Sequence, residues 1–208
     1  MTVPGIDVSA YQRRVDWPRV AASGARFVYA RCADGLRHPD ALFPQHVAGA
    51  KAAGLFVGAY LFVRLEQPLA PQAEALLAAH ELCGARRLPP VLDLEHGSEG
   101  KLTAEETRAA ARALVALVEE RLGRPPVVYT CAGWWAGRMG PRDLGHCPLW
   151  VAHYGAKAPL MPPPWSRWHL WQHAGDEGRQ EGVEGACDLD VWQGAEGELE
   201  AWAEGVCR

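Results

Sequence analysis

Long hydrophobic runs and an excess of one charge are both missing from the sequence. No apolar stretch approaches the ~20 residues that a membrane-spanning helix requires. Met1 to Gly5 also lack the basic start and apolar core of a secretory signal. The 21 basic and 25 acidic residues are spread along the chain, with a formal charge of −4. Nucleic acid and anionic membrane both require concentrated positive charge, so we predict neither as a partner, and no membrane insertion.

Paired cysteine motifs are absent as well. None of the cysteines forms a C-x-x-C pair, which argues against a zinc ribbon and against a thioredoxin-like redox motif. Free buried cysteines and one or two disulfides both remain open, because cysteine also behaves as a small hydrophobic residue. The six are Cys32, Cys83, Cys131, Cys147, Cys187 and Cys207.

Histidine spacing does not favour a metal site. His153, His169 and His173 lie near the ends of predicted strands, where a metal hydrolase would also place its ligands. On a strand, however, residues four apart share a face at too great a distance to bind one ion. We therefore expect solvated or aromatic-packed histidines, no metal and no cofactor.

Hydrophobic residues make up 49% of the 208 residues, which is enough for one domain spanning residues 1–208. Nine of the residues are tryptophan. Flat apolar rings stack on sugars and so favour a carbohydrate cleft, whereas ordinary core packing is the alternative explanation.

Short β-like runs alternate with helical stretches along the whole chain, a pattern typical of an α/β fold with a mainly parallel sheet. About eight strands are predicted, which suggests a barrel: 4–8, 27–31, 55–62, 90–94, 126–130, 149–152, 169–172 and 188–191. Helices are predicted from Pro39-Asp40 to Ala53, and over residues 72–82 with Pro71 at the head. A third helix spans residues 103–122, where Thr103 and Glu106 form a capping box and Gly123 ends the helix.

Acidic residues gather at the ends of these predicted strands. Ligand sites in parallel α/β sheets lie at the carboxyl ends of the strands. Asp93 and Glu95 are two apart and so point the same way on an extended strand. Paired carboxylates are typical of glycosidic cleavage, although a D-x-E sequence alone also fits solvated acids. The other strand-end acids are Asp7, Asp34, Asp188 and Asp190.

Several motifs occur together in one order over nearly the whole chain. In that order the sequence resembles glycoside hydrolase family 25, the Chalaropsis-type lysozymes. The motifs are Gly5-Ile-Asp-Val-Ser9, Tyr11-Gln12, Asp16-Trp17, Tyr29-Ala-Arg31, Asp34-Gly35, Gly58-Ala-Tyr60, Leu92-Asp-Leu-Glu95, Tyr129-Thr130, Leu149-Trp-Val-Ala-His-Tyr154, Trp171-Gln172 and Gly182-Val-Glu-Gly-Ala-Cys-Asp-Leu-Asp190.

The resemblance implies an irregular, flattened β/α barrel that cleaves the β-1,4 bond between N-acetylmuramic acid and N-acetylglucosamine in peptidoglycan. Glu95 matches the catalytic acid. Asp93 matches the carboxylate that polarises the substrate's acetamido group in a substrate-assisted, retaining reaction. Asp7 and Asp188 match the other acids of the cleft and are expected to position substrate and tune Glu95.

Other positions are expected to contact substrate. By resemblance these are Tyr60, Tyr129, Tyr154, Trp171, Gln172 and Asp34. Arg31 would bind a substrate carboxylate or, equally, pair with Asp7 or Asp34.

Three positions depart from the family pattern. Arg13 stands where glycine is common, and Leu61 where histidine is common. Asp190 replaces a commoner asparagine after Asp188, a change expected to alter only a surface bond. These departures bear on glycan or peptide-stem recognition more than on the acid chemistry.

Two alternatives remain beside a muramidase: a non-catalytic glycan-binding module, favoured by the tryptophan content, and a different barrel hydrolase acting on chitin or using a metal. We expect a monomer that acts on the cell wall. Without a visible signal, release by phage lysis, delivery by a secretion apparatus or a trimmed chain fits equally. An immunity or inhibitor protein has no signature in the sequence.

Overall fold

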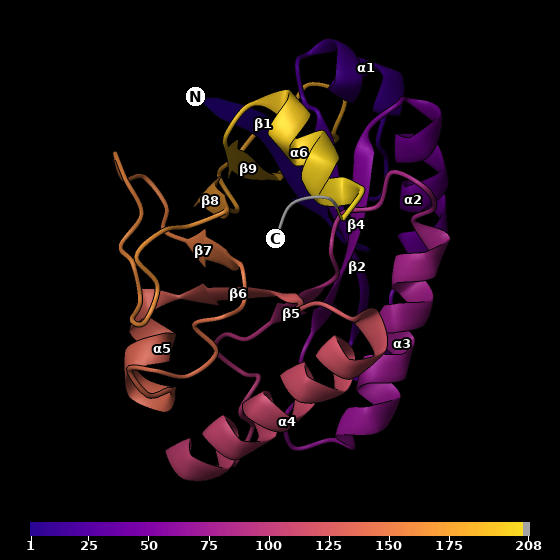
Figure 1. Cartoon of the computed structure of the whole chain (residues 1–208). Helices are drawn as coiled ribbons and strands as arrows, with labels where there is room; N and C mark the ends of the chain where they lie inside the picture. Colours follow the sequence, from indigo (N-terminus) through magenta and orange to yellow (C-terminus); the bar gives the residue numbers. More distant parts are fainter. Residues whose placement is uncertain (206–208) are drawn as a thin grey trace.

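Strands from the whole length of the chain join in one sheet, with the order β1-β9-β8-β7-β6-β5-β4-β2-β3. A further pairing of β1 with β2 closes this sheet into a barrel of eight strands. The ninth, the two-residue β3 (His38–Pro39), pairs only with β2. The computed structural model describes residues 1–205 (Figure 1). The predicted α/β barrel of about eight strands is confirmed.

All eight predicted strands are present, with ends shifted by three residues at most. They are β1 (Thr2–Val8), β2 (Phe27–Asp34), β4 (Phe56–Phe62), β5 (Val91–Asp93), β6 (Val127–Cys131), β7 (Leu149–Ala152), β8 (Leu170–Ala174) and β9 (Asp188–Gln193). The sheet is mainly parallel, as expected. The exceptions are β9, which runs antiparallel to both β1 and β8, and the short β3, which runs antiparallel to β2.

The helices follow the prediction less closely. They are α1 (Trp17–Ala22), α2 (Phe43–Ala52), α3 (Leu69–Leu82), α4 (Ala104–Leu122), α5 (Ala132–Arg138) and α6 (Glu196–Ala203). For α4 the prediction is confirmed: Thr103 and Glu106 form the capping box, and Gly123 ends the helix with φ 72°. The short helices α1, α5 and α6 span too few turns to show a clear hydrophobic period, and the sequence did not predict them.

Two predicted helix starts were wrong by a few residues. Helix α2 begins only at Phe43, because Pro39 belongs to β3 and Asp40 binds the backbone N–H groups of Ala10 and Leu42. Helix α3 begins at Leu69, before Pro71. A proline is tolerated within the first turn, where backbone N–H groups have no partner inside the helix.

Alternation along the strands divides the apolar residues into two cores. One fills the barrel interior and includes Phe27, Tyr29, Tyr129 and Trp150; the other lies between the barrel and its helices. Helices α2, α3 and α4 lie along one side (Figure 1). No helix separates β7, β8 and β9 in the chain, so loops cover that side and the barrel is irregular.

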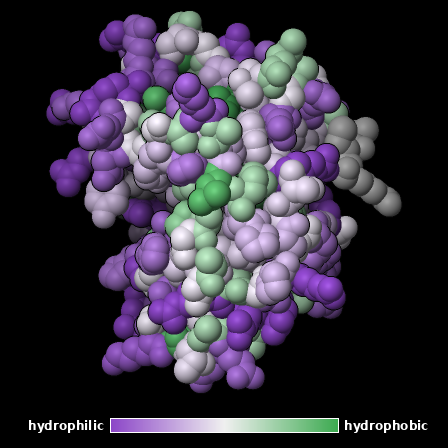
Figure 2. Space-filling model, turned by 90° about the vertical axis from the view of Figure 1, so that its left-hand side faces the viewer, coloured by the Kyte–Doolittle hydropathy of each residue, from purple (hydrophilic) through white to green (hydrophobic). Residues whose placement is uncertain are grey.

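The surface shown in Figure 2 carries mostly hydrophilic and neutral residues, with a short central strip of hydrophobic ones. Such scattered apolar side chains are ordinary on a protein surface. Within residues 1–205, no helix combines the length and apolar character needed to cross a bilayer.

Gly58 allows the interior aromatic layer to pack. A Cβ atom there would lie 2.1 Å from the ring of the fully buried Tyr29. Gly58→Ala should therefore lower the free energy of unfolding by about 1–3 kcal/mol, the usual cost of overpacking a core. Gly133→Ala in α5, where the added Cβ meets nothing within 4 Å, is the control and should not destabilise the protein. Urea denaturation of both variants measures the difference, and equal stability would show that the barrel interior tolerates the extra carbon.

Candidate active site

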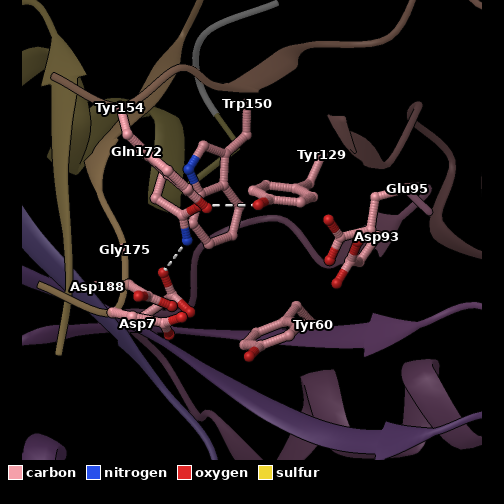
Figure 3. A pocket seen from close by; sticks show the side chains of 11 residues that line it. Asp7, Tyr60, Asp93, Glu95, Tyr129, Trp150, Tyr154, Gln172, Gly175 and Asp188 are labelled. Carbon is pink, nitrogen blue, oxygen red and sulfur yellow. Dashed lines mark hydrogen bonds between the residues drawn. The ribbon is translucent and has the colours of Figure 1, made fainter. Parts of the chain in front are cut away.

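A cavity of about 150 Å³ opens at one end of the barrel (Figure 3). Its walls are Asp7, Tyr60, Asp93, Glu95, Tyr129, Trp150, Tyr154, Gln172, Gly175, Asp176 and Asp188. The parallel strands deliver their residues at their carboxyl ends. Because β9 is antiparallel, its first residue, Asp188, reaches the same end and lies opposite Asp7.

Eight of the residues predicted from sequence meet in this cavity. They are the four acids Asp7, Asp93, Glu95 and Asp188, together with Tyr60, Tyr129, Tyr154 and Gln172. Asp93 and Glu95 were predicted to point the same way, and both side chains face the cavity (Figure 3).

Arg31 and Asp34 do not line the cavity. Asp34 forms a bidentate pair with Arg64, with a distance of 2.8 Å between Oδ2 and Nη2. Arg31 Nε lies 3.4 Å from a carboxylate oxygen of Asp40, so the predicted pairing of Arg31 with Asp7 or Asp34 was wrong. The sequence could not reveal these pairs, because Asp40 and Arg64 come from segments with no predicted role.

Trp171 faces away from the cavity. Its neighbour Gln172 points into the barrel, and side chains alternate along a strand. Trp171 instead packs against the outer core and donates its indole N–H to the backbone oxygen of His153.

Three wall residues were not predicted: Trp150, Gly175 and Asp176. Trp150 belongs to the same alternating face of β7 as Ala152, so its inward direction was available from the strand pattern. Gly175 and Asp176 follow β8 in a loop, where no sequence period indicates direction.

Gln172 joins the two sides of the cavity through hydrogen bonds. Its amide N–H donates to Asp7 at 2.6 Å. Its carbonyl oxygen accepts from the hydroxyl groups of Tyr129 at 2.7 Å and Tyr154 at 2.8 Å. The bonds to Asp7 and Tyr129 are visible in Figure 3. The side chain of Gln172 is 3% exposed, so these partners replace the water that it would otherwise bind.

A turn after β5 sets the position of Glu95. Ser98 accepts a hydrogen bond from the Glu95 backbone N–H and donates its hydroxyl to the backbone oxygen of Asp93. The Ser98 backbone N–H also donates to the backbone oxygen of Glu95, at 2.9 Å. The fully buried Ser98 therefore holds the two acidic residues in one local arrangement.

Burial and neighbouring acids raise the pKa of several carboxyl groups in the cavity. Burial, and then the charge of Asp188, raise the pKa of Glu95 to about 7. Burial and Asp176 raise the pKa of Asp188 to about 6. For Asp93, burial and Glu95 raise the pKa well above its ordinary value, and Arg31 offsets part of that rise. The cavity therefore contains a carboxyl group that can donate a proton near neutral pH.

Asp190 was expected at the surface, and this was wrong. Asp188, Asp190 and Trp192 share one face of β9, which is the face turned to the barrel interior. Asp190 is 1% exposed and accepts a hydrogen bond from the indole N–H of Trp150 at 2.9 Å.

Most of the tryptophan content belongs to the packing of the protein. Seven of the nine are buried: Trp17, Trp134, Trp135, Trp150, Trp165, Trp192 and Trp202. Trp150 alone among all nine lines the cavity. A stacking surface for sugars is therefore not where most of these rings lie.

Histidines and cysteines take structural positions. His169 stacks on Trp202, and burial lowers its pKa to about 4. Within residues 1–205 no cluster of three or more metal-binding side chains occurs. The five cysteines of this range are free thiols, and Cys207 lies outside it.

The Gln172 network should matter for stability as well as for shape. Gln172→Leu keeps the volume but removes partners from the buried Asp7 and Tyr129, and an unpaired buried polar group costs about 1–3 kcal/mol. We expect a loss of at least that size in urea denaturation. Tyr154→Phe is the matched control: it removes one bond at a residue that is 54% exposed, and should cost less. Equal losses would contradict the network as described.

Comparison with known proteins agrees with this geometry. The family model "Glycosyl hydrolases family 25" matches residues 6–183, which ends before Asp188. Lysozyme M1 of Streptomyces globisporus is 33% identical over 97% of this chain and 71% of its own. A bacterial lysozyme from Streptomyces coelicolor superposes with a TM-score of 0.90 at 31% identity, covering 99% of this chain and 98% of that one. A family GH25 lysozyme from Aspergillus fumigatus gives 0.87 at 30% identity, covering 99% and 100%. The chain therefore belongs to family 25 of the glycosyl hydrolases.

Proposed function

We propose that this glycoside hydrolase is a lysozyme that cleaves the β-1,4 bond between N-acetylmuramic acid and N-acetylglucosamine in peptidoglycan. The observation that carries the proposal is one cavity holding Asp93 beside Glu95, whose pKa is raised to about 7. Glycosidic cleavage needs an acid for the leaving oxygen and a second group for the developing charge at the anomeric carbon. The names of the relatives, lysozyme and muramidase, support the same substrate.

Glu95 is the general acid and base. In the first step it gives its proton to the glycosidic oxygen as the bond to the anomeric carbon breaks. In the second step the carboxylate removes a proton from the attacking water. A pKa near the working pH suits both halves of this cycle.

Asp93 assists the acetamido group of the substrate. Its Oδ1 is buried and has no hydrogen-bond partner among residues 1–205, so it is available to accept the acetamido N–H. That bond would orient the acetamido oxygen toward the anomeric carbon, where it forms a cyclic intermediate on the face opposite the leaving group. Water then opens this intermediate, so the configuration is retained.

The remaining wall residues bind and position the sugar. Asp7 and Asp188 accept hydroxyl or amide protons, and Asp188 also raises the pKa of Glu95. Tyr60, Tyr129 and Tyr154 contribute rings and hydroxyl groups, and Gln172 keeps Tyr129 and Tyr154 in place. Arg31 and Asp34, which face other partners, have no part in this proposal.

The two alternatives predict different products. A glycan-binding module would bind cell walls without releasing new reducing ends. A hydrolase of another class would release a reducing end other than muramic acid, or would lose activity with a chelator. As a muramidase the protein would be bacteriolytic and act on the wall outside the cytoplasmic membrane. We propose a monomer with the glycan strand as its partner.

Replacement of Glu95 tests the acid assignment. Glu95→Gln cannot donate a proton, so release of soluble fragments from dye-labelled peptidoglycan should fall by about 10²–10⁴-fold, the usual contribution of general acid catalysis. Glu105→Gln, the same change on the exposed surface of α4, is the control and should keep wild-type activity. Mass spectrometry of the muropeptides identifies the product end. Equal release by wild type and Glu95→Gln would refute the assignment.

The pH profile tests the electrostatics of the site. Because Glu95 must be protonated to act as the acid, kcat/KM on a soluble glycan oligomer should fall as the pH rises through about 7. Asp188 raises that pKa by its negative charge, so Asp188→Asn should move this alkaline limb to lower pH. A limb that stays in place would show that Asp188 does not act on Glu95, whatever the loss of rate.

A further inference from the structure

A second pair of acids connects the cavity wall with the layer beneath it: Asp7 lines the cavity, and Asp190 does not. In the antiparallel pairing of β1 with β9, Asp7 lies opposite Asp188 and Gly5 lies opposite Asp190. Asp7 and Asp190 are therefore diagonal neighbours on the inner face of the barrel, where the ring of Phe27 fills the space above Gly5. The two carboxyl groups are close enough for each to affect the pKa of the other through a hydrogen bond, and Asp188 has the same relation to Asp7 from the cavity side.

The surrounding protein supplies few hydrogen-bond donors to these two carboxyl groups. Asp190 is 1% exposed, and one of its oxygens accepts from the Trp150 indole N–H. Its other oxygen, Oδ2, is buried and has no donor within residues 1–205. Asp7 is 4% exposed and receives one donor, the amide of Gln172. Without a proton between them, the facing oxygens of Asp7 and Asp190 would be two buried acceptors with no donor. Burying a polar group without a hydrogen-bond partner is unfavourable.

We propose that Asp7 and Asp190 share one proton, and that Asp190 is a positioning residue that holds the Asp7 carboxyl in place at the cavity wall. The shared proton turns the contact between two acceptors into a hydrogen bond. Two buried carboxylates in contact do not both ionise, as in other enzymes with paired acids. The second half of the proposal, the role in positioning, rests on the proposed function.

The surroundings favour the proton. Burial comes first in raising the pKa of both groups, followed by neighbouring acids. The titratable groups that face the pair are Cys187 just before β9, Asp188 at the start of β9, Tyr29 on β2, Tyr60 on β4, Tyr129 on β6 and Tyr154 after β7. Within residues 1–205, the charged groups that act most strongly on either carboxyl are acids, and these favour the proton.

The pH dependence of unfolding tests the shared proton without any substrate. The folded protein holds a proton that the unfolded chain releases above the ordinary carboxyl range, so rising pH favours unfolding. In Asp190→Asn the amide donates to Asp7, which then ionises, and the proton is no longer needed. Above about pH 5, the unfolding equilibrium constant of wild type relative to this variant should rise about tenfold per pH unit, until the pair gives up its proton.

Two further variants complete the stability test. The ratio of unfolding constants between wild type and Asp7→Asn should rise with pH at the same slope, because the proton belongs to the pair. Asp7→Asn therefore replaces Asp190→Asn in the test if the latter does not fold. Glu177→Gln removes one exposed carboxyl and controls for the loss of a charge. If wild type and either buried-pair variant differ by a constant factor from about pH 5 to about pH 8, the shared proton is refuted.

Activity tests the positioning role. Asp190→Ala leaves Trp150 and Asp7 without their partner and should lower kcat, whereas Asp190→Asn supplies both contacts and should restore it. With Asp7 fully ionised, Asp190→Asn should also move the alkaline limb of kcat/KM to higher pH, because more negative charge faces Glu95 through the cavity. Equal kcat in the Ala and Asn variants would overturn the positioning role. An inactive wild type would refute the proposed function and leave the unfolding result unaffected.

Discussion

The antiparallel pairing of β9 with β1 and β8 is the constraint on which the rest of this structure depends. It joins the last strand of the chain to the first and, together with the β1–β2 pairing, closes the barrel. The reversed direction also matters chemically. The amino end of β9 lies beside the carboxyl ends of the other strands, so Asp188 enters the cavity and Asp190 lies one layer below. A parallel β9 would deliver its carboxyl end there instead.

Closure of the barrel buries the acids and so raises the free energy of their ionised forms. Interior aromatic side chains exclude water, so each carboxyl depends on protein partners or keeps its proton. Gln172 supplies an N–H to Asp7, and Trp150 supplies one to Asp190. Glu95, which lies beyond β5 at the rim, is buried less completely, and its pKa rises only to about 7. Depth in one barrel therefore gives similar residues different protonation states, as paired-acid chemistry requires.

The same closure explains the small residues of the inner face. Gly5 and Gly58 occupy inward positions where a Cβ atom would meet the rings of Phe27 and Tyr29 at 2.4 Å and 2.1 Å. Those rings, with Trp150, fill the floor beneath the cavity. The floor both supports the wall residues and keeps solvent away from the lower acids. Packing and electrostatics are therefore set by the same layer of side chains.

Local patterns in the sequence determined the strands, the capped helix α4 and the inward direction of Asp93, because hydrophobic period and capping act over a few residues. The order of motifs indicated the family and eight residues of the cavity. Tertiary structure alone decided the partners and directions of the other residues. Arg31 and Asp34 pair with Asp40 and Arg64, Trp171 faces outward, and Asp190 lies buried against Asp7. Those outcomes depend on contacts between segments far apart in the chain, and no local pattern encodes the register of β9 against β1.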